Sequence, residues 1–377
     1  MLAPNATIGI VGGGQLGRMS ALAAARLGYR CHILSPEPDS PAAQVAAAHT
    51  LGDYESPDTL RAFARAVDVI TFEFENVSAA GLDLLASLKP VHPAPAILRI
   101  SQDRVLEKSF LAGAGVATAP WAEITSADAL MVAPIPLPAV LKTTRLGYDG
   151  KGQAVLRDPA DRDAAWQSLA PKPLILEGFV PFACELSVVI ARGADGSSVT
   201  FDVVENRHRD GILNITLAPA RIDPATAAAA QAIATRVADA LGLIGVLAVE
   251  MFLTHDGRLL VNELAPRPHN SGHWTIDACP ASQFELHIRA IAGLPLPPAT
   301  RHSDAVMKNL VGAEIEHWPR IVATPSLSAH LYGKAEARPG RKMGHVTQLY
   351  RRGTAPDDAT IIQALGWINP PPPPHTP

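Results

Sequence analysis

The strongest constraint on the fold is the alternation of short apolar segments with helical segments across residues 1–95. Apolar runs at Thr7–Val11, Cys31–Leu34 and Val67–Thr71 have the length and composition of buried strands. Helical patterns cover Gln15–Leu27 and Ser78–Leu88. Because strands that alternate with helices form parallel sheets, the pattern predicts a doubly wound α/β domain over residues 1–100.

A different pattern begins at residue 101. A helical segment over residues 101–116 is followed by strand-like runs such as Val199–Val204, several of them joined by hairpin turns like Asp195-Gly196 and Asp256-Gly257. Hairpins outnumber crossovers here, so we expect an α+β domain over residues 101–298. A proline-rich stretch, Leu294–His302, precedes a predicted smaller domain of short strands over residues 299–368, and the prolines of residues 369–377 predict a mobile tail.

Composition narrows the class of protein. Hydrophobic residues make up 47% and charged residues 18% of the 377 residues, which is typical of a globular protein. The net charge of -4 gives no general attraction to nucleic acid or to anionic lipid. The three cysteines form no CxxC pair, and neither a signal peptide nor a membrane span is visible. We therefore expect a cytoplasmic protein that binds neither nucleic acid nor membranes.

A glycine motif follows the first predicted strand. Gly12, Gly14 and Gly17 form GxGxxG, and Glu37 lies near the offset of the ribose-binding acid in dinucleotide folds. Three interpretations remain open at this point: an NAD site, a site for another phosphorylated molecule, or tight packing of the turn. We favour a phosphorylated substrate, because backbone amides at a helix N-terminus bind any phosphate.

A second group of residues suggests a nucleoside triphosphate. Lys142 ends an apolar strand, and the loop GYDGKGQ of residues 147–153 carries three glycines and a lysine that suit phosphate oxygens. Glu177 and Glu185 flank an apolar stretch whose backbone could face a purine base while a carboxylate accepts from ribose hydroxyls. Taken singly, Lys142 is typical of a surface lysine and the loop of a hairpin turn.

Two carboxylates lie on strands that a hairpin joins. Glu250 is embedded in GVLAVEMF, and Glu263 follows Asn262 in LLVNELAP. A buried carboxylate without a partner is costly, so Glu250 requires a partner or a metal ion. Carboxylates that are adjacent across a ladder can share Mg²⁺, with Mn²⁺ as an alternative ion, and Asn262 can add a neutral oxygen.

The order of these elements resembles the ATP-grasp superfamily. Two further stretches, NELAPRPHNSGHWT (residues 262–275) and RPGRKMGH (residues 338–345), make the chain similar to the N5-carboxyaminoimidazole ribonucleotide synthetase family. IGIVGGGQLGRM and TFEFENV (residues 71–77) also resemble that family, so the likeness covers nearly the whole chain. The resemblance implies an ATP-grasp fold between the two flanking domains, and a homodimeric ligase of purine biosynthesis.

The resemblance also implies a set of site residues, each named by its position in this sequence. The implied ATP-binding residues are Arg104, Lys142, Gly147, Tyr148, Asp149, Gly150, Lys151, Gly152, Gln153, Glu177, Gly178, Phe179, Val180, Glu185, His208, Asn262 and Glu263. The implied metal ligands are Glu250 and Glu263. The implied residues for the ribonucleotide are Gly14, Gln15, Leu16, Glu73, Lys334, Arg338, Arg341 and Lys342, and the implied catalytic residues are Arg267, Asn270, His273 and Tyr148.

The implied reaction carboxylates aminoimidazole ribonucleotide with ATP and bicarbonate through carboxyphosphate. Arg267 would stabilise the carboxyphosphate oxyanion, while His273 and Asn270 would orient the carboxyl group; a structural role for His269 and His273 stays open. Other interpretations are a different ATP-grasp carboxylase or ligase, such as biotin carboxylase or the formate-using glycinamide ribonucleotide transformylase, a nicotinamide dehydrogenase built on the glycine motif, and a non-catalytic nucleotide-binding regulator. A dehydrogenase leaves the acidic pair unexplained, and a non-catalytic regulator is disfavoured because groups for both a metal ion and phosphates are present.

Overall fold

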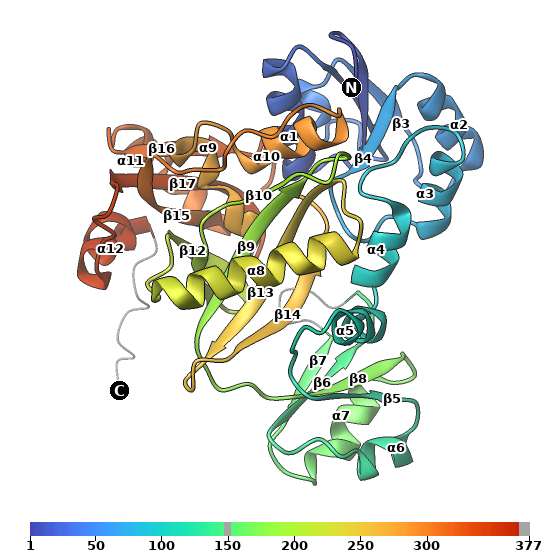
Figure 1. Ribbon diagram of the computed structural model, residues 1–377, viewed down its shortest axis with the longest axis vertical. Coiled ribbons are helices and arrows are strands. Elements are labelled where there is room, and N and C mark those ends of the chain that lie inside the picture. Colours follow the sequence, from blue (N-terminus) through green and yellow to red (C-terminus); the bar gives the residue numbers. More distant parts are fainter. Residues whose placement is uncertain (147–151, 369–377) are drawn as a thin grey trace.

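The computed structural model describes residues 1–146 and 152–368, and these residues contain three β-sheets (Figure 1). The first sheet is parallel, with strand order β3-β2-β1-β4, as the sequence predicts. Its elements are β1 (Thr7–Val11), α1 (Gln15–Arg26), β2 (Arg30–Ser35), η1 (Ala43–Val45), β3 (Ala48–Leu51), α2 (Pro57–Arg65), β4 (Val69–Phe72), α3 (Ala79–Ala86) and α4 (Pro95–Ser101). The sequence does not reveal β3, because this edge strand is short and only partly buried.

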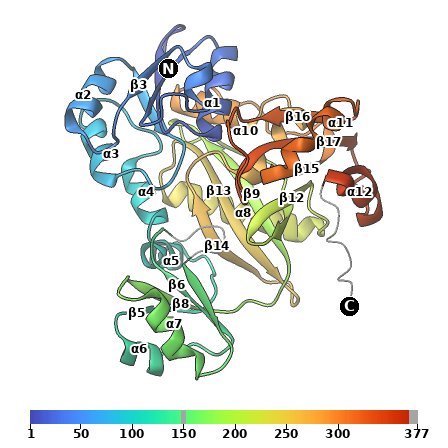
Figure 2. The same ribbon diagram turned by 180° about the vertical axis from the view of Figure 1, so that it is seen from behind.

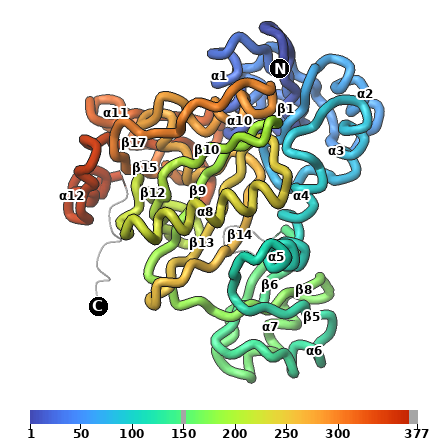
Figure 3. The backbone as a smooth tube through the Cα atoms, viewed as in Figure 1, coloured from blue at the N-terminus to red at the C-terminus, as the bar shows by residue number. Residues whose placement is uncertain are grey.

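A second, antiparallel sheet of four strands forms a small lobe with strand order β5-β8-β6-β7. Its elements are α5 (Arg104–Gly113), β5 (Trp121–Ile124), α6 (Ala127–Val132), β6 (Ala139–Thr143), β7 (Gln153–Leu156), α7 (Asp161–Leu169) and β8 (Leu174–Gly178). Helix α5 lies between this lobe and β14 of the large sheet, as the backbone tube shows (Figure 3). The single helix predicted over residues 101–116 is wrong at its start, because Asp103 caps a new helix by accepting from the amides of Val105 and Leu106.

The third sheet is antiparallel and joins the centre of the chain to its C-terminal part (Figure 2). The main strand order is β14-β13-β9-β11-β12-β15-β17-β16, with β10 paired to β9. Its elements are β9 (Phe182–Arg192), β10 (Ser198–Thr200), β11 (Val204–Arg209), β12 (Ile212–Ala218), α8 (Pro224–Ala240), β13 (Gly245–Thr254), β14 (Leu259–Ala265), η2 (Asn270–Gly272), α9 (Thr275–Ala278), α10 (Gln283–Ile291), β15 (Ser303–Val311), η3 (Gly312–His317), α11 (Trp318–Val322), β16 (Leu327–Leu331), β17 (Lys342–Arg351), α12 (Asp358–Leu365) and η4 (Gly366–Ile368).

Two predictions about strands are wrong. The expected strand Val199–Val204 is divided between β10 and β11. Two of the three described C-terminal strands are not short, since β15 has nine residues and β17 has ten, and β15 pairs directly with β12. Their apolar pattern is hidden from sequence reading by polar side chains that are buried within them, including Lys308 and His345. The proline-rich stretch before β15 therefore lies between two parts of the chain whose strands belong to the same sheet.

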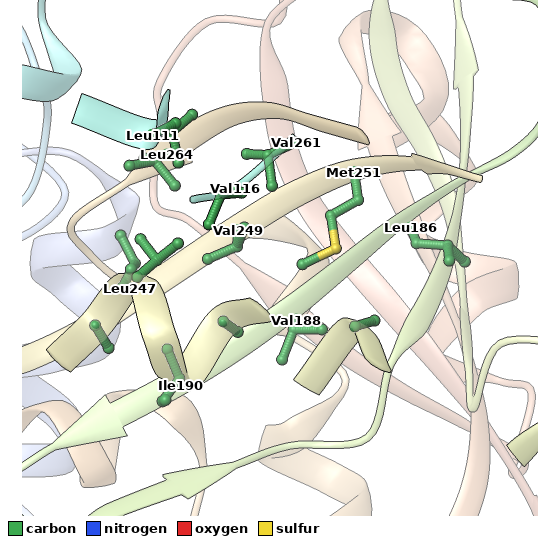
Figure 4. Packing of buried hydrophobic residues seen from close by; sticks show 14 of the residues in the cluster. Leu111, Val116, Leu186, Val188, Ile190, Leu247, Val249, Met251, Val261 and Leu264 are labelled. Carbon is green, nitrogen blue, oxygen red and sulfur yellow. The ribbon is translucent and has the colours of Figure 1, made fainter. Parts of the chain in front are cut away.

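Helix α8 covers one face of the large sheet and encloses its main core. Valine, leucine, isoleucine and methionine side chains from β9, β13 and β14 point into this core, together with residues of α5 and of the segment after it (Figure 4). The sequence explains the fit, because α8 presents alanines such as Ala230 and Ala234 that let it pack close to the strands. The core thereby fixes the strands whose other residues face the candidate site.

A helix that crosses a membrane must be both long and apolar. None of the helices in residues 1–146 and 152–368 is both long enough and apolar enough to cross a membrane.

Candidate active site

A cleft of about 500 Å³ separates the small lobe from the large sheet. Side chains from β6, β8, β9, β13 and β14 line it, so it lies where the two antiparallel sheets face each other. The predicted site residues that line this cleft are Arg104, Lys142, Gln153, Glu177, Gly178, Phe179, Val180, Glu185, His208, Glu250, Asn262, Glu263, Arg267, Asn270 and Lys342. Segments far apart in sequence thus meet in one place.

Two partly buried carboxylates lie opposite each other in the cleft. Glu250 of β13 and Glu263 of β14 are direct partners in the ladder, as the hairpin predicts. Burial, and then repulsion by Glu250, raises the pKa of the Glu263 carboxyl. Burial also acts to raise the pKa of Glu250, but the adjacent His269, with Nε2 2.9 Å from the carboxylate, reverses this and leaves it lowered. A pair of like charges held this close suits a shared cation.

The cleft also supplies the other groups that a divalent cation with phosphates requires. Asn262 contributes a neutral amide beside Glu263, and hard cations prefer oxygen ligands of both kinds. A guanidinium nitrogen of Arg104 lies 3.5 Å from the Glu263 carboxylate. The donor set therefore fits Mg²⁺, and cationic side chains stand beside it.

The small lobe contributes a lysine and a glutamate that contact each other. Lys142 donates to the Glu177 carboxylate at 2.8 Å, and Lys108 lies 3.9 Å from the other oxygen of that carboxylate. Burial acts to raise the pKa of Glu177, but the two ammonium groups outweigh it and the pKa is lowered. Glu177 therefore stays ionised, and its charge holds the Lys142 ammonium at the side of the cleft formed by the small lobe.

The opposite wall carries a carboxylate–histidine pair and an aromatic pair. Glu185 of β9 and Nδ1 of His208 of β11 share a short hydrogen bond. Burial acts to lower the pKa of His208, but this bond and the charge of Glu185 raise it overall. Phe182 and Phe252 stack nearly parallel, with ring centroids 4.8 Å apart. This aromatic wall is not evident from the sequence, because the two residues are 70 positions apart and only the β9–β13 register brings them together.

At the far end of the cleft lie the residues expected to handle the carboxyl group. Arg267 forms an ion pair with Glu75 at 2.9 Å, a partner that sequence reasoning does not identify. Nδ1 of His269 contacts the Ser271 hydroxyl at 2.8 Å while its Nε2 faces Glu250. The Asn270 side chain is held by reciprocal hydrogen bonds with Asn309 at 2.7 and 2.9 Å.

The structure does not favour the catalytic role predicted for His273. This histidine is only 1% exposed, lies outside the cleft lining and contacts Gln283 through Nδ1 at 3.1 Å. Burial keeps its pKa well below the ordinary value, so the ring is neutral. The two histidines of the motif RPHNSGH are four residues apart, and the turn η2 between them sends only His269 toward the cleft.

The glycine motif and the C-terminal basic segment lie close together, as predicted. Gln44 of η1 accepts from Arg18, the residue after the glycine motif, at 2.8 Å and donates to the Gly333 carbonyl at 3.0 Å. Lys334 is near enough to Glu73 for their charges to interact, and it donates to the Lys342 carbonyl at 2.7 Å. Arg341 donates to the backbone of Glu336 at 3.0 Å.

The glycine amides do not stand open for a phosphate as the sequence suggests. The Glu73 carboxylate accepts from the amides of Gly14 at 2.6 Å and Gly17 at 3.0 Å. A Cβ at Gly14 would lie 2.6 Å from that carboxylate, so a larger residue there would have to displace the Glu73 side chain. A carboxylate of the chain therefore occupies the helix N-terminus that the motif was expected to offer to a ligand.

Three other predicted residues also lie away from the cleft. Leu16 packs in the core of the N-terminal domain, and its neighbour Gln15 begins α1 without lining the cleft. Arg338 is exposed and pairs with Glu336 two residues earlier, which is the arrangement of a solvated turn. These contacts place all three side chains away from the cleft.

The glycine-rich loop is described in part. Gly147, Tyr148, Asp149, Gly150 and Lys151 lie outside the described residues, as does the tail 369–377. Gly152 has a positive φ of 70° and accepts from the Thr143 amide at 2.9 Å through its carbonyl. Gln153 starts β7 opposite Lys142.

Three family models match consecutive parts of the chain. They describe a ribonucleotide synthetase preATP-grasp domain at residues 5–102, an ATP-grasp domain at residues 109–284 and a phosphoribosylaminoimidazole carboxylase C-terminal domain at residues 305–355. The first match covers the parallel sheet, the second covers the small lobe and the larger part of the third sheet, and the last covers the C-terminal strands of that same sheet. The acidic pair and the lysine of the cleft lie inside the ATP-grasp domain. The fold and site define the chain as an ATP-grasp ligase.

Relatives of known name identify the family. An N5-carboxyaminoimidazole ribonucleotide synthase of Brucella melitensis is 51% identical over 93% of this chain and 98% of its own, and that of Bacillus subtilis is 42% identical over 97% and 96%. The chain belongs to the N5-carboxyaminoimidazole ribonucleotide synthase family. A solved ADP complex of such a synthetase superimposes with a TM-score of 0.93 at 42% identity, covering 98% of this chain and 97% of the other. An Aspergillus clavatus synthase in complex with ADP and aminoimidazole ribonucleotide gives 0.89 at 32% identity, covering 97% and 98%.

Proposed function

We propose that the chain uses ATP and bicarbonate to carboxylate the exocyclic amine of 5-aminoimidazole ribonucleotide, giving N5-carboxyaminoimidazole ribonucleotide, ADP and phosphate. The observation that carries the proposal is the facing pair Glu250 and Glu263 in a cleft that continues to Arg267. A cation-binding pair for phosphates and a guanidinium for a carboxyl group thus lie in one cavity. The named relatives support the choice of substrate.

The chemistry follows from the poor reactivity of bicarbonate. A bicarbonate oxygen attacks the γ-phosphorus of ATP, the bond to the β–γ bridging oxygen breaks, and carboxyphosphate and ADP form. The substrate amine then attacks the carboxyl carbon or CO₂ released there, phosphate leaves, and the nitrogen loses a proton. Such phosphoryl transfer depends on positioning and on neutralising charge, for which Arg104 and Lys142 are placed.

Glu250, Glu263 and Asn262 would hold Mg²⁺, or Mn²⁺ in its place. When bound, the ion supplies positive charge to the phosphate oxygens. Lys142, fixed by Glu177, binds the phosphates from the other side of the cleft. We assign the adenine to the segment Glu177–Val180 and the aromatic wall, and the ribose to Glu185 with His208 beside it.

Arg267 binds bicarbonate and the carboxyphosphate oxyanion in this proposal. Its ion pair with Glu75 orients the guanidinium across the cleft before either ligand arrives. His269 replaces His273 as the histidine that contacts the carboxyl group, because it lines the cleft and His273 does not. Asn270 orients the same group, held by Asn309.

For the ribonucleotide, we propose the junction of the glycine motif with the basic segment. Lys334, Arg341 and Lys342 contact the 5′-phosphate, while Glu73 contacts the aminoimidazole. The other residues that we assign to the ribonucleotide are Gly14, Gln15, Leu16 and Arg338. The residues that we assign to cover the ATP phosphates are Gly147, Tyr148, Asp149, Gly150, Lys151, Gly152 and Gln153, and Tyr148 is also assigned a catalytic role. We further propose domain limits at residues 100 and 298, a homodimer, and a cytoplasmic location.

One assay tests the proposal. ADP release by the purified chain is measured with ATP, Mg²⁺ and bicarbonate, with and without aminoimidazole ribonucleotide. We expect bicarbonate-dependent release that rises when the ribonucleotide is added. Release that responds to biotin, formate with glycinamide ribonucleotide, or neither acceptor would contradict the proposal.

A further inference from the structure

The strand that carries Asn262 and Glu263 has an irregular backbone. In the β13–β14 ladder, Glu250 pairs with Glu263 and Met251 pairs with Val261, which leaves Asn262 without a partner. Asn262 is therefore the extra residue of a β-bulge, and a bulge turns backbone groups away from the ladder. Strand β14 is also the edge of its sheet, so its outer side has no neighbouring strand along the main strand order.

The chain after α5 pairs with this outer side at one bridge, where the Val261 amide donates to the Ala117 carbonyl at 2.8 Å, and side chains of helix α5 bond to the backbone that follows. Lys108 donates through Nζ to the Asn262 carbonyl at 2.8 Å and lies 3.5 Å from the Val261 carbonyl. Glu107 accepts from the Leu264 amide at 2.7 Å. The bonds thus satisfy backbone groups on both sides of Glu263, which faces the cleft.

The spacing on α5 explains why one helix can do this. Arg104, Glu107 and Lys108 are three and four residues apart, so they share a helix face, and all three reach the segment that holds the acidic pair. Glu107 is 2% exposed and Lys108 is 1% exposed. Burying two ionisable side chains is costly unless each is well bonded, which points to a specific requirement at this position.

We propose that Glu107 and Lys108 are positioning residues that hold the bulge of β14 and so aim Asn262 and Glu263 at the divalent ion. The inference rests on the proposed use of that ion. Lys108 also faces the Glu177 carboxylate, which holds Lys142. The same buried ammonium therefore links the metal-binding strand to the phosphate-binding lysine of the small lobe.

The test compares Lys108→Met with Lys308→Met. Lys308 is an equally buried lysine that bonds to Asn214 and Glu314 and lies outside the cleft lining. Binding of Mn²⁺ in the presence of ADP is measured by electron paramagnetic resonance, and hydrogen exchange of the Leu264 amide by NMR. We expect Lys108→Met to bind Mn²⁺ at least about tenfold more weakly, a loss of about 1.4 kcal/mol, and to exchange this amide faster. Lys308→Met keeps both values although its melting temperature falls.

Two milder variants extend the test if Lys108→Met does not fold. Glu107→Gln retains an oxygen acceptor for the Leu264 amide and keeps Mn²⁺ binding near the parent value, whereas Glu107→Leu weakens it. Equal Mn²⁺ binding by Glu107→Leu and Glu107→Gln, or by folded Lys108→Met and parent, overturns the inference. The exchange rate of the amide needs no ion, so it reports on the positioning even if the parent binds no Mn²⁺, which would instead contradict the proposed function.

Discussion

At the scale of single residues, Glu263 has a role that its surroundings make testable. Its carboxyl is partly enclosed in the cleft beside Glu250, and the two charges repel unless a cation lies between them. Glu263→Gln removes one charge at almost constant volume, so we expect ADP release to fall by at least about a hundredfold, in the range that loss of a charge-stabilising group produces. Steady-state assays at increasing Mg²⁺ check this, and near-normal activity would remove the metal assignment.

The two histidines of RPHNSGH should separate into a functional and a structural residue. His269→Gln is expected to reduce bicarbonate-dependent ADP release by about tenfold or more, because it removes a side chain of the cleft. His273→Gln is expected to cost about 1–3 kcal/mol of unfolding free energy, because it disturbs a buried hydrogen bond. Denaturant titration and the ADP assay on both variants measure the difference, and a large catalytic loss in a stable His273→Gln protein would restore the original prediction.

The partly buried Lys334 predicts that binding of the ribonucleotide depends on pH. Burial, followed by the charge of Arg341, lowers the pKa of this lysine to about 8. The ammonium is charged below that pH and neutral above it, so binding of the 5′-phosphate weakens as the pH rises through this value. We expect kcat/KM for the ribonucleotide to fall by up to about tenfold from pH 7 to pH 9, since this ratio reports groups of the free enzyme. Lys334→Arg keeps its charge in this range and should flatten the profile, whereas an unchanged profile would contradict the assignment.

At the scale of elements, Asp103 connects helix formation with ATP binding. Its carboxylate caps α5 and also contacts Arg145 at 3.2 Å, and α5 begins with Arg104. Asp103→Ala should lower the unfolding free energy by about 1 kcal/mol, and the loosened first turn should raise the KM for ATP. Asp223→Ala removes the corresponding cap of α8, far from the cleft lining, and should lower stability alone. If the KM for ATP is unchanged in Asp103→Ala, the cap of α5 does not influence ATP binding, and the prediction is wrong.

Elements with a strong local pattern could be predicted from the sequence. The strand–turn–helix at the start and the hairpin that pairs Glu250 with Glu263 are local features, and both are present. The bulge at Asn262 and the bonds from Lys108 could not be predicted, because they depend on a helix that is about 150 residues away in the chain. The same limit applies to Glu75 with Arg267 and to the stacked phenylalanines. The position of His273 outside the cleft lining could not be predicted either, since motif spacing does not reveal which way a turn directs each histidine.

At the scale of the whole molecule, one sheet crosses the proposed boundary at residue 298. Strands β12 and β15 pair over four registered positions, from Ile215 with Lys308 to Ala218 with Ala305. The cleft lining also takes Lys342 from the start of β17 beyond that boundary. The central and C-terminal parts are therefore separate matches to family models but share backbone hydrogen bonds.

This continuity predicts how the chain unfolds. Removing residues 303–368 would expose the edge of β12 and the apolar residues Ile215 and Leu217, which share a core with Val306 and Leu310 of β15. We therefore expect the shortened chain to aggregate and not to fold as an ATP-binding unit. In the full chain, native-state hydrogen exchange should give similar opening free energies for the amides of β12 and β15 that bond to each other, because neither strand can leave the sheet while the bonds between the two remain. The small lobe has its own core and its own sheet, so β5–β8 should open at lower free energy without β12. Independent opening of β15 at much lower free energy than β12 would show that the C-terminal part is a separate folding unit after all.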